Sequence, residues 1–299
     1  MKEEEYSHCS ETIIIYLFGG LGNQLFQLSF AIGLSKKTSK KVVLSDAYLK
    51  DSLRASENTF LTSQNLVGIT SSRCKLHLYP QIFSIKDIDF QNLSCCIITF
   101  PENSQWLGHI SNKKVFMEII SASLNSIPTL HNDTSGILIH FRLGDYLFPP
   151  ASFRYGVLKT SYHQKILSKL PANSPISLVT DDIRACRRIY KSILHGREIS
   201  FSEFSSSEED FKRMCSAEIF IAANSTMSFW AAWYRMQLSG DETIGKRTYV
   251  PYQIYRRDSI DDFLGVGNTS SIFWHPIQLM FRHPWVLGRR LKWKERLWI

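Results

Sequence analysis

The chain has 299 residues, 44% of them hydrophobic and 13% aromatic, and can therefore bury one large core or two of ordinary size. Its formal net charge of +8 arises largely in the last 28 residues, which hold six Arg or Lys residues against one acid. The rest of the chain lacks the basic excess typical of nucleic-acid-binding proteins, so we expect no nucleic-acid partner.

A glycine-rich turn joins the first two expected elements. Residues 13–18 form a continuous β-branched and aromatic run, which predicts a buried parallel strand. Residues 23–35 predict a helix, and a strand is expected over 41–45. Bare glycines let backbone N–H groups approach a bound anion or sugar closely, so we expect Gly20, Gly22 and Asn23 to contact a ligand.

Two other interpretations of this turn remain open. One is a dinucleotide-binding turn, because G-x-G follows a strand and Asp46 lies where a ribose-binding acid is expected. Leu25 argues against it, since it replaces the third Gly or Ala of that pattern. The other is a purely structural turn, which would leave the polar residues Asn23 and Gln24 unexplained.

A second β/α array follows a polar stretch over residues 125–135, which contains Pro128 and predicts a linker. The expected strands cover residues 136–141, 176–180, a short segment near 199, and 218–223, and the expected helices cover 162–170, 183–194 and segments starting near 207 and 225. Two such arrays predict an α/β fold with two Rossmann-like domains facing a cleft. We place the domains at 1–130 and 131–272, followed by a helical tail over 273–299 that is rich in basic and aromatic residues.

The segment HFRLGDY carries the first candidate site of the second array. Strand alternation puts His140 and Arg142 on one face at the carboxyl end of a strand, and Asp145 lies in the loop beyond. An arginine there can hold a diphosphate through two charge-assisted bonds, which strengthen as negative charge builds on a departing nucleoside diphosphate. The alternative is that Arg142 and Asp145 only pair to fix the loop.

Polar side chains also follow two further strands of this array. Asn224, Ser225 and Thr226 open a helix, and hydroxyls and free N–H groups at a helix N-terminus suit phosphate. The alternative is ordinary N-capping by Ser225 or Thr226. Asp181 has the lone pairs to accept N1–H and N2–H of guanine or to bond a ribose hydroxyl, but it and Asp182 could equally cap the next helix.

Three segments taken in order, GGLGNQLFQ (19–27), HFRLGDY (140–146) and ANSTMSFWAAW (223–233), resemble the α-1,2-fucosyltransferase family, the bacterial relatives of the blood-group H enzymes. Weaker agreement at LVTDD (178–182) and at residues 107–110 extends the resemblance over residues 12–235. The resemblance implies a GT-B enzyme that needs no metal or cofactor. It would move L-fucose from GDP-fucose to the 2-hydroxyl of a galactoside, with inversion, in surface polysaccharide or O-antigen synthesis.

The resemblance also implies roles for single residues. His140 and Arg142 fall on the family's H-x-R-R-x-D motif, whose first arginine holds the GDP phosphates, and Asp145 falls on its final acid. Leu143 replaces the second arginine, which puts in doubt any mechanism that needs two adjacent guanidinium groups. The general base stays open between Asp145 and Asp46, and Asn23 could instead orient the incoming hydroxyl or the donor. GDP-fucose would bind the C-terminal domain and the acceptor the N-terminal one.

A D-x-D pattern at Asp87 and Asp89 matches the signature with which another glycosyltransferase architecture holds a metal. The residues before it make a poor buried strand, so we interpret it as a surface turn and expect no metal site. Two other functions remain alternatives: an oxidoreductase that binds a flavin or nicotinamide at the glycine turn, and a noncatalytic sugar-binding protein.

Location follows from the cysteines and the two ends of the chain. None of the six cysteines forms a C-x-x-C pair or lies at zinc-finger spacing from histidines, which favours free thiols in a reducing compartment. No secretion signal or transmembrane anchor is visible, so we expect a cytoplasmic protein. The tail over 273–299 mixes tryptophans with basic residues. It suits peripheral contact with an anionic membrane, where a lipid-linked acceptor would lie, or a terminal helix packed across the two domains.

Overall fold

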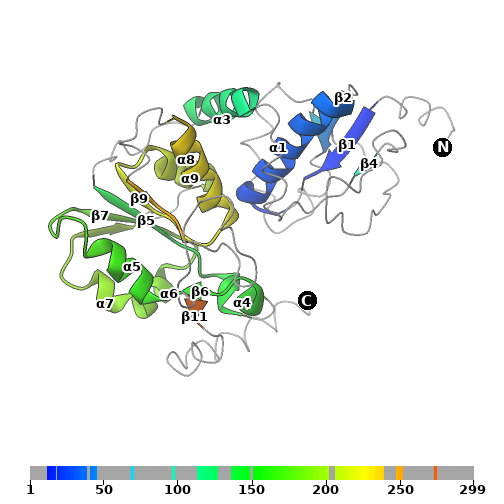
Figure 1. The fold of residues 1–299 in the computed structure, drawn as a ribbon. Coiled ribbons are helices and arrows are strands. Elements are labelled where there is room, and N and C mark those ends of the chain that lie inside the picture. Colours follow the sequence, from blue (N-terminus) through cyan, green and yellow to red (C-terminus); the bar gives the residue numbers. More distant parts are fainter. Residues whose placement is uncertain are drawn as a thin grey trace. The chain divides into compact units, whose positions relative to one another are not determined.

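The computed structural model describes residues 12–17, 19–38, 41–45, 69–70, 96–97, 113–126, 136–148, 151–201, 206–238, 247–251 and 273–274. The chain divides into two compact units, residues 1–130 with 206–209 and residues 131–205 with 210–299. Both are α/β units with parallel sheets, as the sequence predicted (Figure 1). Asp46, the D-x-D pattern, residues 107–110 and residues 275–299 lie outside the described residues.

The first unit contains a sheet of four parallel strands in the order β3-β2-β1-β4. Its described elements are β1 (Thr12–Tyr16), α1 (Leu21–Thr38), β2 (Lys41–Ser45), β3 (Ile69–Thr70), β4 (Cys96–Ile97) and α3 (Lys113–Ser126). Ile13, Ile14 and Ile15 are all buried. Burial of successive residues on both faces explains why the strand sequence is continuously apolar rather than alternating.

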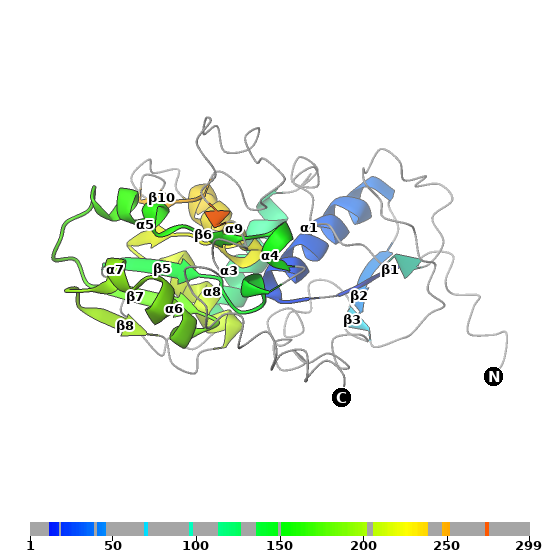
Figure 2. The ribbon, with the colours of Figure 1, turned by 90° about the horizontal axis from the view of Figure 1, so that it is seen from below.

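The second unit holds a five-stranded parallel sheet in the order β10-β9-β5-β7-β8, which Figure 2 shows from β10 through β5 and β7 to β8. Its sheet strands are β5 (Ile137–Phe141), β7 (Ile176–Thr180), β8 (Ile199–Phe201), β9 (Ile219–Ile221) and β10 (Thr248–Tyr249). Its helices are η5 (Asp145–Leu147), α4 (Ala151–Arg154), α5 (Thr160–Leu167), α6 (Ile183–Ile189), α7 (Lys191–Leu194), α8 (Ser207–Ser216) and α9 (Thr226–Leu238).

The connections of this sheet place its ligand-binding edge. The chain leaves the central strand β5 towards β7 and β8, and then returns to the other side of β5 as β9 and β10. Figure 1 shows α8 and α9 on one side of the sheet and α5, α6 and α7 on the other. Strand order therefore reverses between β5 and β9, and in open α/β sheets the crevice beyond the carboxyl ends at such a point is where ligands bind.

Alternate residues of β5 serve two different cores. Ile137, Ile139 and Phe141 belong to one buried cluster with the strands and helices on the α5–α7 side. Leu138 and His140 are buried as well but lie outside that cluster, on the opposite face of the strand. A central strand enclosed by helices on both faces leaves only its ends for chemistry.

The C-terminal region differs from the predicted helical tail at its first residues. Phe273–Trp274 forms strand β11, which pairs antiparallel with β6 (Val157–Leu158). A strand pairing anchors this part of the chain to the second unit, and the basic residues beyond it are not among those described. None of the helices in the described ranges is long and apolar enough to cross a bilayer.

Candidate active site

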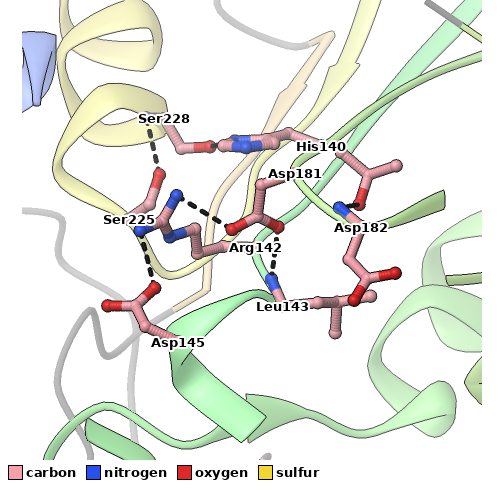
Figure 3. A network of polar contacts seen from close by, with 9 residues as sticks. His140, Arg142, Leu143, Asp145, Asp181, Asp182, Ser225 and Ser228 are labelled. Atoms are coloured by element: carbon pink, nitrogen blue, oxygen red, sulfur yellow. Dashed lines mark hydrogen bonds and ion pairs between the residues drawn. The ribbon is translucent and has the colours of Figure 1, made fainter. Parts of the chain in front are cut away.

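Arg142 lies just beyond the carboxyl end of β5 and contacts two carboxylates (Figure 3). Its Nη2 is 2.7 Å from Oδ1 of Asp145, and its Nη1 is 2.9 Å from Oδ2 of Asp181. The loop-fixing pair with Asp145 that the sequence left as an alternative is thus present, and a second acid joins it. The Arg142 side chain is still 22% exposed, so solvent and ligands reach it.

An aromatic pair supports the guanidinium. The Arg142 guanidinium lies over the Tyr146 ring, 5.3 Å from its centroid, and Tyr146 stacks on Tyr155 with centroids 4.8 Å apart. Burial raises the pKa of Tyr146 far above its ordinary value, so its phenol stays neutral and adds no charge beside Arg142. The ring therefore fixes the plane of the guanidinium without neutralising it.

The two acids after β7 have separate tasks. Asp182 accepts a hydrogen bond from the Ala185 amide at 2.9 Å and so caps α6. Asp181 accepts the Leu143 amide at 2.8 Å through Oδ1 and holds Arg142 through Oδ2. The capping alternative therefore applies to Asp182. For Asp181 the contacts favour support of the Arg142 loop over the predicted contact with guanine.

Leu143 and Gly144 explain how Asp181 comes so close to this loop. The Leu143 side chain is fully buried in the core cluster, so position 143 faces away from the site while its amide faces Asp181. A Cβ on Gly144 would lie 2.6 Å from Oδ2 of Asp181, closer than real Cβ contacts. Glycine at this position therefore leaves room for the carboxylate.

His140 is a buried connection between β5 and α9. The residue is only 3% exposed, and its Nδ1 lies 2.6 Å from Oγ of Ser228, which also accepts the Ala223 amide at 3.0 Å. Burial, assisted by the positive charge of Arg142, lowers the pKa of His140 to about 3, so the imidazole is neutral at physiological pH. The sequence predicts that His140 contacts the donor, whereas its burial favours a role in fixing the start of α9 beside β5.

The N-terminus of α9 presents polar groups at the same edge. Ser225 Oγ accepts the Ser228 amide at 3.1 Å, which is the N-capping role that the sequence left open. Thr226 is the first residue of the helix and is half-buried, and no interaction of its hydroxyl occurs within the described ranges. The first helical amides and the Thr226 hydroxyl lie at the positive end of a helix of 13 residues, a position that suits an anion.

Asn224 has a different role from the predicted phosphate contact. Its side-chain Nδ2 donates to the carbonyls of Tyr155 and Gly156, at 3.1 and 3.0 Å, and the residue is buried. Both amide hydrogens are used in these bonds, which leaves only an acceptor oxygen. These bonds favour a structural role for Asn224, which ties the strand end to the loop that carries Tyr155.

In the first unit, the glycine turn has the expected compact form. Gly19 adopts a positive φ of 70°, and a Cβ there would lie 2.5 Å from Nδ2 of Asn23, so this position requires glycine. Gln24 Nε2 donates to the Gly19 carbonyl at 2.9 Å, which gives this polar residue a structural task. Gly20 precedes the helix and Gly22 is its second residue, while Asn23 stays half-buried at the turn.

The second unit thus brings most of the predicted site residues to the carboxyl ends of three adjacent strands, β7, β5 and β9. Sequence analysis did not identify Ser228, Tyr146 and Tyr155 as residues of the site. Ser228 lies three positions after the capping Ser225, and Tyr146 directly follows Asp145, so their spacing was the available signal. Within the described ranges there is no group of three or more His, Cys, Asp or Glu residues placed to hold a metal.

Sequence comparison places these residues in a known context. The family model described as glycosyl transferase family 11 matches residues 109–253, which include His140, Arg142, Asp181 and Ser225. An alpha-1,2-colitosyltransferase of Escherichia coli is 23% identical, with 84% of this chain and 95% of the relative covered. The O-antigen biosynthesis glycosyltransferase WbnK of Escherichia coli is 26% identical, with 73% and 88% covered.

Solved structures with a similar chain path include two fucosyltransferases. NodZ from Bradyrhizobium is 13% identical with a TM-score of 0.45, and the likeness covers 74% of this chain and 92% of NodZ. POFUT1 in complex with GDP is 11% identical with a TM-score of 0.40, covering 82% and 99%. The matches in sequence agree with the resemblance that the three motifs predicted: the family model and both relatives from Escherichia coli are glycosyltransferases.

Proposed function

We propose that the chain transfers L-fucose from GDP-β-L-fucose to the 2-hydroxyl of a galactoside in a glycan, with inversion at the fucose anomeric carbon and without a metal ion. The observation that carries the proposal is the place of Arg142. Its guanidinium extends from the end of the central strand β5, beside the point where strand order reverses, and stays accessible between two carboxylates. The donor and the linkage come from the resemblance to the α-1,2-fucosyltransferases.

The groups at this edge suit a nucleoside diphosphate as leaving group. Arg142 supplies a fixed positive charge, and the start of α9 supplies the Thr226 hydroxyl and unpaired helical amides from the adjacent strand end. As the bond from sugar to diphosphate breaks, negative charge grows on the phosphate oxygens, and prearranged donors stabilise that state more than the ground state. Neutral His140 holds α9 without competing with Arg142 for phosphate.

The proposed reaction is a single displacement. The acceptor hydroxyl attacks the fucose anomeric carbon from the side opposite to GDP and loses its proton, while the electron pair of the breaking bond goes to the diphosphate. Asp145 is a candidate for accepting that proton because it is the more exposed of the two carboxylates, at 34% against 26% for Asp181. Asp46 stays an alternative base, and Asn23 an orienting group.

In this proposal the two units have different substrates. Residues 131–272 bind GDP-fucose, and residues 1–130 bind the acceptor at the turn that contains Gly20, Gly22 and Asn23, in a GT-B arrangement. The relatives from Escherichia coli support an acceptor in O-antigen assembly, since one of them is named for that process. A lipid-linked acceptor at the inner face of the membrane, met through the basic tail, would fit a cytoplasmic enzyme.

The colitosyltransferase relative makes a second donor sugar worth testing. Colitose lacks the 3-hydroxyl of fucose. A site that hydrogen-bonds that hydroxyl would reject the deoxy sugar strongly, whereas a site that leaves it in solvent would use both donors. The ratio of kcat/KM for GDP-fucose to kcat/KM for GDP-colitose therefore shows which of these two kinds of donor site the protein has.

The test of the main proposal is product analysis. Purified protein is incubated with GDP-fucose and a panel of β-galactosides in excess EDTA, and products are identified by mass spectrometry and NMR. We expect a product heavier by one deoxyhexose, with an α-configured fucose on O2 of galactose; a reaction without acceptor is the control. Absence of fucosylated product with every acceptor contradicts the proposal, and activity lost in EDTA but restored by Mn²⁺ contradicts its metal independence.

A further inference from the structure

The two carboxylates on Arg142 are attached in different ways. Asp145 comes from the same loop, three residues on, and contacts Arg142 through a single bond from Nη2 to Oδ1. Asp181 comes from the end of the neighbouring strand β7 and uses both oxygens, one for Arg142 and one for the Leu143 amide. Asp181 is therefore joined to the loop at two points and Asp145 at one.

The backbone reinforces this difference. Gly144 lies directly against the Asp181 carboxylate, where a Cβ would be 2.6 Å from Oδ2. Withdrawal of Asp181 would also leave the Leu143 amide without its acceptor, and an unpaired, partly buried amide is costly. Asp145 can leave by rotation of its own, more exposed side chain.

We propose that Asp181 is the positioning residue of Arg142, and that Asp145 is the carboxylate that the donor's diphosphate displaces from Nη2. This inference rests on the proposed function, because it needs a diphosphate to bind at Arg142. A guanidinium between two carboxylates already carries a local net charge of −1. An entering diphosphate adds more negative charge, so repulsion favours the release of one acid, and the singly attached one is the easier to release.

Displacement has a consequence for the reaction. Once Nη2 of Arg142 bonds the diphosphate, the Asp145 carboxylate has lost its cationic partner and both of its oxygens can accept hydrogen bonds from sugar hydroxyls. A carboxylate without its positive neighbour is also the better proton acceptor. Donor binding would thus prepare the candidate base, while Asp181 keeps Arg142 in place from the β7 side.

The experiment measures the affinity for GDP by isothermal titration calorimetry in four proteins: wild type, Asp145→Asn, Asp181→Asn and Asp182→Asn. Asp145→Asn removes the competing charge and should tighten GDP about 2- to 5-fold, the range of partly exposed ion pairs. Asp181→Asn should weaken GDP by about tenfold, because Arg142 loses its anchor. Asp182→Asn is the matched control: it makes the same change of charge one residue away, keeps a residue able to cap α6, and should leave GDP affinity unchanged.

Guanosine, measured by ligand-observed NMR in the same proteins, separates this role from contact with the base. It lacks phosphates, so its binding should not change in Asp145→Asn or Asp181→Asn. Loss of guanosine binding in Asp181→Asn would assign Asp181 to the guanine ring and overturn the positioning role. Equal or weaker GDP binding by Asp145→Asn, or tightening of the same size in Asp182→Asn, overturns displacement. Wild-type protein that fails to bind GDP overturns the proposed function together with this inference.

Discussion

Replacement of Arg142 should lower the rate of the reaction much more than it lowers the stability of the fold. In the free protein the residue makes ion pairs with Asp145 and Asp181, whose side chains are 34% and 26% exposed. Partly exposed pairs contribute about 0.2–1 kcal/mol each and the contact with the Tyr146 ring about 0.5–1 kcal/mol, so Arg142→Ala should lower the free energy of unfolding by no more than about 3 kcal/mol. At about 2–4 °C per kcal/mol for a domain of this size, the melting temperature should fall by less than about 12 °C.

The effect on the reaction should be much larger. Loss of one prearranged donor to a developing oxyanion lowers kcat about 10²- to 10³-fold in other enzymes, which corresponds to about 2.7–4 kcal/mol. Arg142→Lys keeps the charge, but its single ammonium cannot reproduce contacts from two terminal nitrogens to separate carboxylates, so we expect intermediate activity. Both variants should therefore lose activity while they remain folded.

The assay follows GDP release with saturating acceptor and, in parallel, thermal unfolding by circular dichroism. Arg187→Ala is the matched control, because this arginine also lies over an aromatic ring, that of Phe201 at 4.5 Å, but extends from the exposed surface of α6. Its kcat should match wild type. A kcat within about threefold of wild type for Arg142→Ala would refute the assignment of the phosphate contact.

Three further changes test the surroundings of the site. Asn224→Ala removes the bonds to the Tyr155 and Gly156 carbonyls and should lower the free energy of unfolding by about 1–3 kcal/mol in urea; an unchanged midpoint would contradict its role as a tie. Arg235→Met leaves the carbonyls of Met214, Cys215 and Ala217 without their buried donor and should cost about 3 kcal/mol or more, which urea titration would also report; stability equal to wild type would show that water replaces it. His140 and His163 both have pKa values lowered to about 3 by burial, so the unfolded chain binds more protons than the folded chain between that value and about 6.5. Stability should be full above pH 6.5 and should fall by up to about 1.4 kcal/mol per pH unit for each histidine as the pH drops towards 3; unfolding curves at pH 7, 6 and 5 that coincide would contradict this.

Strands and the turns after them were predictable because local sequence determines them. The predicted strands over 41–45 and 176–180 agree with β2 and β7 to the residue, since both are short apolar runs bounded by polar residues. Helix α3 was not predicted, although Phe116, Ile119, Ile120 and Leu124 have helical spacing, and its last two residues were included in the expected linker over 125–135.

One predicted helix is divided in the structure for a reason that lies outside its own sequence. Residues 183–194 form α6 and α7, which are separated at Tyr190. The Tyr190 side chain is buried, and its hydroxyl donates to the Leu158 carbonyl at 2.7 Å. A buried ring and a tertiary hydrogen bond outweigh the modest helix propensity at this position, and neither is visible in the local pattern.

The partners of the site residues depend on strand order, which the sequence does not state. That polar residues follow β5, β7 and β9 could be read from the chain, but which ends meet could not. Because β7 flanks β5 on one side, an acid, Asp181, reaches Arg142 from there. Because β9 flanks it on the other, Ser228 at the start of α9 reaches His140. The central strand therefore has negative charge on one side and helix N–H groups on the other, so an anionic ligand at Arg142 is favoured on the α9 side.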